Sequence, residues 1–87
     1  MPINFDDLTE EQKTERQISA MGDSVYVINK EIATGNHTEE IHNTIDRNVR
    51  HLEIMLSKEN IQNSGSSLTV FETAISDGRA YIELSIT

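Results

Sequence analysis

The chain has 87 residues, enough for one small domain, and it carries 7 Lys and Arg against 15 Asp and Glu, a formal net charge of −8. It contains no Cys, which excludes a disulfide scaffold, cysteine-ligated zinc and thiol chemistry. The anionic balance argues against nucleic-acid binding, because attraction to phosphate needs a cationic face. Only 36% of the residues are hydrophobic and 5% are aromatic, so the core is small, and self-association is a usual way for such chains to gain stability.

The chain divides into three predicted segments. Residues 1–8 form an extended lead-in, because Pro2 disfavours a helical start. Residues 9–62 form a helical hairpin, and residues 63–87 form a polar hinge, a short helix and a C-terminal strand. The acidic start resembles no signal peptide, and no stretch approaches the roughly 20 apolar residues that span a bilayer, so we expect a protein made in the cytoplasm without membrane contact.

The first helix is predicted to begin near Thr9. This residue is a good N-cap, and Gln12 follows three positions later, as in a capping box. Glu10 and Glu11 place negative charge at the positive end of the helix dipole.

A regular apolar pattern continues this helix. Its members follow at spacings of 3, 4, 3 and 4, and they are Ile18, Met21, Val25, Ile28 and Ile32. This is the a/d seam of a heptad repeat. It either packs only within the hairpin or also contacts copies of the chain in a coiled coil, and the small core favours the second, self-association. A strand over residues 24–28 is an alternative, since that stretch is β-branched and aromatic. The helix is favoured because the seam keeps its phase on both sides of the stretch.

A second helix is predicted after a break at Gly35, which suits the left-handed position past a helix end. Thr38 is its expected N-cap, and it fades between Asn60 and Asn63. One face carries the apolar residues Ile41, Ile45, Val49, Leu52, Met55 and Leu56. Asp46 and Arg50 are spaced for an ion pair on the outside. The short connection makes the two helices antiparallel neighbours.

The last third of the chain is predicted to hold a short helix over residues 68–75, ended by Asp77-Gly78. Residues 80–86 then alternate, with Ile82, Leu84 and Ile86 on one face, as in a β-strand or extended arm. No second strand is evident, so these three residues are expected to pair with another chain by strand addition. The fold class expected is therefore mainly α and oligomeric, with this C-terminal strand or arm.

No motif for catalysis or metal binding is found. His37, His42 and His51 form no metal-binding spacing and are interpreted as solvated, with a metal site as the less favoured alternative. The clustered carboxylates are interpreted as helix caps and solubilising charge. No phosphate-binding loop and no nucleophile elbow is present. The sequence predicts no enzyme, no metal, no cofactor and no small-molecule substrate.

Three stretches resemble small proteins of tailed bacteriophages: PINFDDLTEEQK (residues 2–13), NVRHLEIML (48–56) and FETAISDGRAYI (71–82). The resemblance implies a non-enzymatic structural or assembly protein of the virion, whose partners are copies of itself and other phage structural proteins. It carries over no functional residue. The alternative function is that of a small acidic phage protein that binds and inhibits a host factor.

Overall fold

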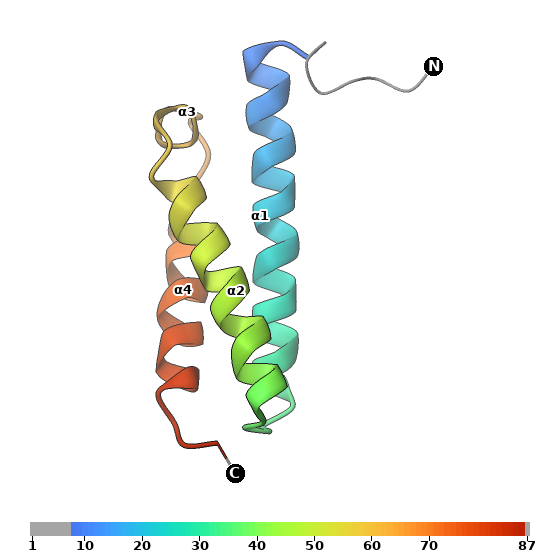
Figure 1. Ribbon diagram of the computed structural model, residues 1–87. Coiled ribbons are helices and arrows are strands. Elements are labelled where there is room, and N and C mark those ends of the chain that lie inside the picture. The colour runs from blue at the N-terminus through green and yellow to red at the C-terminus, as the bar shows by residue number, and fades with distance from the viewer. Residues whose placement is uncertain (1–7, 87) are drawn as a thin grey trace, which may run out of the picture.

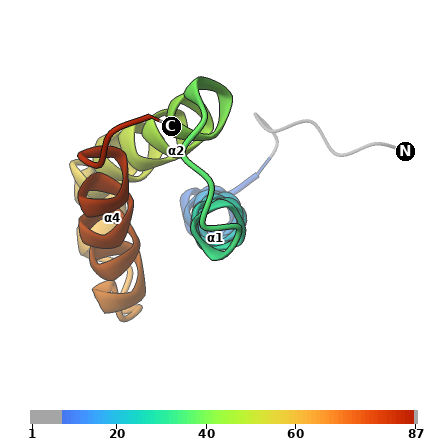
Figure 2. The ribbon, with the colours of Figure 1, turned by 90° about the horizontal axis from the view of Figure 1, so that it is seen from below.

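The computed structural model describes residues 8–86, which form four helices: α1 (Glu10–Ala33), α2 (Glu39–Leu56), α3 (Glu59–Gln62) and α4 (Thr69–Ile82). α1 and α2 are antiparallel, α4 runs back and contacts both, and the one-turn α3 joins α2 to the loop before α4 (Figure 1). Seen from below, α2 crosses obliquely past α1 and α4 (Figure 2). The mainly helical class and the antiparallel hairpin are thus confirmed, while the lead-in predicted for residues 1–8 lies, except for Leu8, outside the described residues.

The start of α1 has the predicted capping box. The backbone N–H of Gln12 donates to Thr9 Oγ1 at 3.2 Å, and the backbone N–H of Thr9 donates to Gln12 Oε1 at 2.9 Å. These two bonds satisfy amides that have no partner within the helix. α1 then continues unbroken through residues 24–28, so the helical interpretation of this stretch is confirmed and the strand is wrong.

The connection between α1 and α2 also forms as predicted. Gly35 follows the end of α1 with a φ of 69°, which glycine adopts without the steric cost that a Cβ would add. Thr38 caps α2 by accepting a hydrogen bond from the Ile41 backbone N–H at 3.1 Å. The five residues between the helices reverse the chain direction, which places α2 beside α1.

α2 ends at Leu56, earlier than the sequence indicates. Lys58 has a ψ of 134° and leaves the helical path, while the side-chain amide of Gln62 donates to the exposed Leu56 carbonyl at 2.6 Å. The bend lets α3 fold back so that Ile61 is fully buried. Burial of one more aliphatic side chain favours the break over a straight continuation of α2.

The core lies where α1, α2 and α4 meet. It consists of Met21, Ile28, Ile45, Val49, Leu52, Met55, Ile61, Phe71 and Ala74. From the predicted heptad seam, Met21 and Ile28 are fully buried, while Ile18, Val25 and Ile32 are half-buried against the core. The seam therefore packs within the chain.

The C-terminal strand predicted for residues 80–86 is not formed, and residues 8–86 contain no strand. α4 continues through Asp77 and Gly78 to Ile82 because a helical face of Phe71, Ala74, Gly78 and Ile82 packs against the other helices. Gly78 is buried in this contact, so it permits close helix packing there and does not end the helix. Beyond Ile82, the exposed residues Leu84 and Ile86 have no regular structure.

Candidate interaction surface

A hollow of about 360 Å³ lies between the C-terminal parts of α1 and α4, and we call it the α1–α4 hollow. Its lining residues are Asn29, Ile32, Asp77, Ala80, Tyr81 and Leu84. The two from α1 are one helical turn apart, and so are Asp77 and Tyr81 from α4. Leu84 follows α4 and closes one side, so the hollow combines apolar walls with two polar side chains.

Two residues that the sequence predicts for association by separate patterns line this hollow. Ile32 is the last member of the heptad seam, and Leu84 belongs to the set predicted for strand addition. Leu84 is 56% exposed and Ile86 is 55% exposed, so both are available to a partner. Ile82, the third member of that set, lies in α4 and is half-buried against the core.

Tyr81 fixes the end of α4 against the turn between α1 and α2. Its ring stacks on His37 with centroids 4.1 Å apart and planes inclined by 19°. Its hydroxyl donates to the backbone carbonyl of Asn36, and its ring meets the edge of His42 at 5.9 Å. Tyr81, which forms one wall of the α1–α4 hollow, is therefore held in place by both histidines and by the Asn36 carbonyl.

His37 and His42 form a pair beside Tyr81. His37 Nδ1 lies 2.8 Å from His42 Nε2, which is hydrogen-bonding distance, and the two rings are nearly perpendicular. His42 is only 8% exposed and His37 is half-buried. The interpretation of these residues as solvated is thus wrong. The sequence gives no signal for the cluster, because Tyr81 joins it from a distant part of the chain.

The third histidine links α1 to α2. His51 Nδ1 lies 2.8 Å from the hydroxyl oxygen of Ser24, which is buried. A serine and a histidine at this distance are two parts of a nucleophilic site. Both residues lie inside long helices, however, where neighbouring backbone N–H groups are used in helical hydrogen bonds and provide no oxyanion hole. The pair is a buried polar link between two helices.

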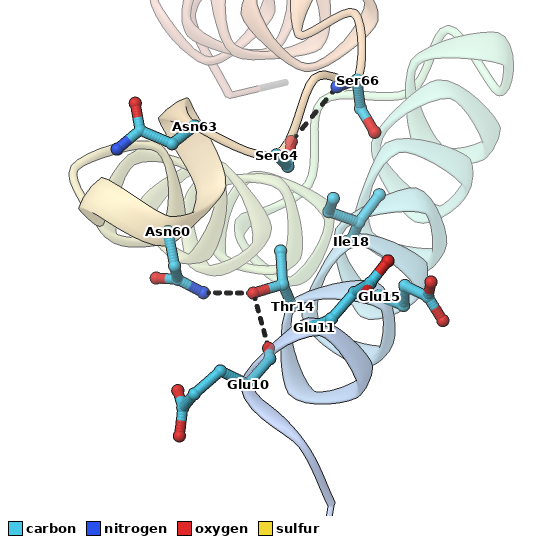
Figure 3. A pocket seen from close by; sticks show the side chains of 9 residues that line it. All are labelled: Glu10, Glu11, Thr14, Glu15, Ile18, Asn60, Asn63, Ser64 and Ser66. Carbon is cyan, nitrogen blue, oxygen red and sulfur yellow. Dashed lines mark hydrogen bonds between the residues drawn. The ribbon is translucent and has the colours of Figure 1, made fainter.

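A second hollow, of about 430 Å³, lies between the first turns of α1 and the loop around α3 (Figure 3). Ile18 of the heptad seam lines it together with Glu10, Glu11 and Glu15. On its edge, the Asn60 amide donates to Thr14 Oγ1 at 2.9 Å, and the Thr14 hydroxyl donates to the Glu10 carbonyl at 3.0 Å. Its acidic rim suits neither an anion nor an acidic partner. No group of three or more potential metal ligands occurs in the part of the chain that the structure describes.

The ion pairs on the outside of the bundle include one within α2 and one between α2 and α4. Arg50 Nε lies 2.9 Å from Asp46 Oδ2, which confirms the predicted pair on α2. Arg79 of α4 donates to the carboxylate of Glu53 on α2. This hydrogen bond is the main cause that lowers the pKa of Glu53, and it raises the pKa of Arg79.

Comparison of the chain with protein-family models, with curated proteins and with solved structures finds no match. Over residues 8–86, no helix has both the length and the apolar character that a membrane span requires. The phage resemblance and the self-association of the chain stay predictions.

Proposed function

We propose that the protein is a non-enzymatic structural or assembly protein of a bacteriophage particle, made in the host cytoplasm, and that it acts through self-association and protein–protein contacts at the α1–α4 hollow. The observation that supports a contact there is the meeting of Ile32 and Leu84 in one hollow. Each belongs to a motif that the sequence marks for association. The bacteriophage assignment rests on the resemblance of three stretches of the chain.

The energetics favour a partner at this end of the bundle. Leu84 and Ile86 lie beyond the last turn of α4, and more than half of each side chain remains in contact with water. Full burial of such a side chain stabilises a contact by roughly 1.5–3 kcal/mol. Asn29 and Asp77 line the same hollow and offer polar contacts at its edge.

Fewer residues of the heptad seam are available for self-association than the sequence predicts. Met21 and Ile28 are fully buried inside the chain, so they are not available to a second copy in this fold. Ile18, Val25 and Ile32 are half-buried and retain exposed surface. A second copy would therefore contact Val25 and Ile32 together with the C-terminal residues, because Ile18 lines the other, acidic hollow.

The experiment measures the protein in purified phage particles by quantitative mass spectrometry. The unaltered protein is expected at a fixed copy number per particle. The double variant L84E/I86E is expected to be depleted from the particles, because it places charge where the contact buries apolar surface. The matched control is I54E, since Ile54 is 61% exposed on α2 and does not line the hollow.

Three outcomes would contradict the proposal in different ways. Equal incorporation of both variants would exclude the hollow as the contact. Absence of the unaltered protein from particles, together with its recovery on one host protein, would favour an acidic inhibitor of that factor. A protein that sediments as a monomer at all concentrations in analytical ultracentrifugation would exclude self-association.

A further inference from the structure

The turn between α1 and α2 brings two imidazole nitrogens together. His37 Nδ1 and His42 Nε2 are 2.8 Å apart, and the planes of the rings are inclined by 81°. A neutral imidazole nitrogen is the commonest protein ligand for transition metals. Two such nitrogens that already face one another are arranged as a chelating pair, and this arrangement is independent of the proposed function.

We propose that His37 and His42 form a binding site for a divalent transition-metal ion of the kind that imidazole prefers, with Zn²⁺ as its probe and water completing the coordination. Zinc binds imidazole nitrogen at about 2.0–2.1 Å, so tetrahedral geometry separates two such nitrogens by roughly 3.4 Å. To admit the ion, the two nitrogens must therefore move apart by about 0.6 Å, and the rings must turn so that both lone pairs point at the ion instead of at each other. His37 lies in the connection between the helices, so this movement leaves α1 and α2 in place.

Metal binding by this pair requires no added acid, base or redox partner. In the present pair, one ring donates the hydrogen of its facing nitrogen to the lone pair of the other. When the metal binds, that hydrogen moves through solvent to the other nitrogen of the same ring. Both facing lone pairs then coordinate the ion. Each ring stays neutral, and no net proton is released from a neutral pair.

The surroundings of the pair hold the rings in place before the metal arrives. Tyr81 stacks on the His37 ring at 4.1 Å and contacts the edge of His42. Its hydroxyl is bonded to the carbonyl of Asn36, the residue before His37. His42 projects from the first turns of a capped helix and is almost wholly buried. These contacts restrict both rings to a small adjustment when the ion binds, so less conformational freedom is lost than for two mobile side chains.

The remaining histidine of the chain supplies an internal control. The Nδ1 atom of His51 is held by Ser24, and no other histidine within residues 8–86 forms a hydrogen bond with it. Zinc that binds any accessible imidazole would involve His51 as readily as the pair. Zinc that requires two converging nitrogens would leave it unchanged.

The test combines calorimetric titration of the full chain with Zn²⁺ and ¹H–¹⁵N spectra of the histidine side chains. We expect one saturable site, with the His37 and His42 signals shifting together and the His51 signals unchanged. The variant H37Q should weaken binding at least about tenfold, because it removes one of two ligands. The control H51Q should retain the affinity of the unaltered protein.

Three results would overturn the proposal: no saturable binding, undiminished binding by H37Q, or shifts of His51 in place of the pair. H37Q changes a residue outside the helices, and circular dichroism checks that it folds. If it does not, the spectra of the unaltered protein decide alone, since they identify which rings the metal contacts. Binding that is retained when both His37 and His42 are replaced by Gln would assign the zinc to surface carboxylates.

Discussion

Gly78 of α4 lies so close to Val49 of α2 that a Cβ on the glycine would come within 2.6 Å of the valine Cγ2. The same Cβ would lie 3.2 Å from Ile45 Cγ2 and 3.4 Å from Ile28 Cγ2. All three neighbours are β-branched and stiff at χ1, so they have little freedom to move away. The absence of a side chain at position 78 is thus what allows α4 to pack against α1 and α2 together.

We expect G78A to destabilise the protein. Overpacking of a core contact costs about 1–3 kcal/mol, whereas Ala in place of Gly inside a helix returns about 1 kcal/mol. The net expectation is a free energy of unfolding lower by up to about 2 kcal/mol, measured by urea denaturation. The matched control is G22A, because a Cβ built there meets no atom within 4 Å apart from the adjoining residues and the backbone of its own helix. That variant should gain up to about 1 kcal/mol, and an equal gain in G78A would contradict the close contact.

The buried hydrogen bond between Ser24 and His51 gives a second prediction. S24A removes the hydroxyl and leaves His51 Nδ1 without its protein partner, so we expect a loss of about 1 kcal/mol in urea denaturation. S19A is the control, since Ser19 is an exposed residue of the same helix. Both variants gain the same helix propensity, and their difference therefore isolates the bond. Indistinguishable stabilities would show that the bond contributes nothing.

A third prediction concerns the stability of the folded protein at acidic pH. The Arg79 guanidinium lowers the pKa of Glu53 in the folded protein, so the folded state binds the proton less readily than the unfolded chain. The stabilisation from this pair is complete above the ordinary Glu pKa of 4.5, and it is lost as the pH falls through the lowered pKa of Glu53. Both side chains are 40% or more exposed, so the effect is small and weakened by salt.

Titration of the Glu53 carboxyl by NMR measures this directly. R79Q should return the pKa of Glu53 toward its ordinary value. R50Q should have a smaller effect, because Arg50 contributes only a weaker electrostatic attraction to the same carboxylate. A Glu53 pKa that is unchanged in R79Q would exclude the hydrogen bond as its cause.

A fourth prediction separates the end of α4 from the residues that follow it. A chain that stops after Glu83 should keep its melting temperature, since Leu84 and Ile86 are exposed. A chain that stops after Arg79 loses Tyr81 and Ile82, which pack against the core, and should lose about 2 kcal/mol or more of stability. Thermal unfolding followed by circular dichroism compares the two. Equal melting temperatures would mean that the last turn of α4 does not contribute to the fold.

Local sequence signals predicted the beginnings of the two long helices. The capping residues Thr9 and Thr38 and the left-handed Gly35 act through neighbours within a few positions, so their effect can be read without knowing the fold. The heptad seam likewise identified the buried face of α1. Local rules failed where a distant contact decided the outcome. Asp77-Gly78 is typical of a helix end, but burial of Gly78 against Val49 continues the helix through it.

The candidate surface was predicted only in part. Ile32 and Leu84 were identified as association residues by two unrelated patterns, and no rule of local spacing could show that they line one hollow. His37 and His42 are five residues apart, a spacing that does not bring two side chains together on one face of a helix. It forms because His37 lies in the turn and Tyr81 covers both rings, a contact that requires the whole bundle.

Asn60 has a consequence for the alignment of α1. Its amide nitrogen donates to Thr14 Oγ1 at 2.9 Å and to Gln17 Oε1 at 2.8 Å, which uses both of its hydrogens on adjacent turns of one helix. A slide of α1 by one turn, about 5.4 Å, would break both bonds at once. A rotation of α1 about its axis that preserved one of these hydrogen bonds would break the other. This side chain therefore adds to the core contacts two hydrogen bonds that hold α1 in one axial position against the start of α3.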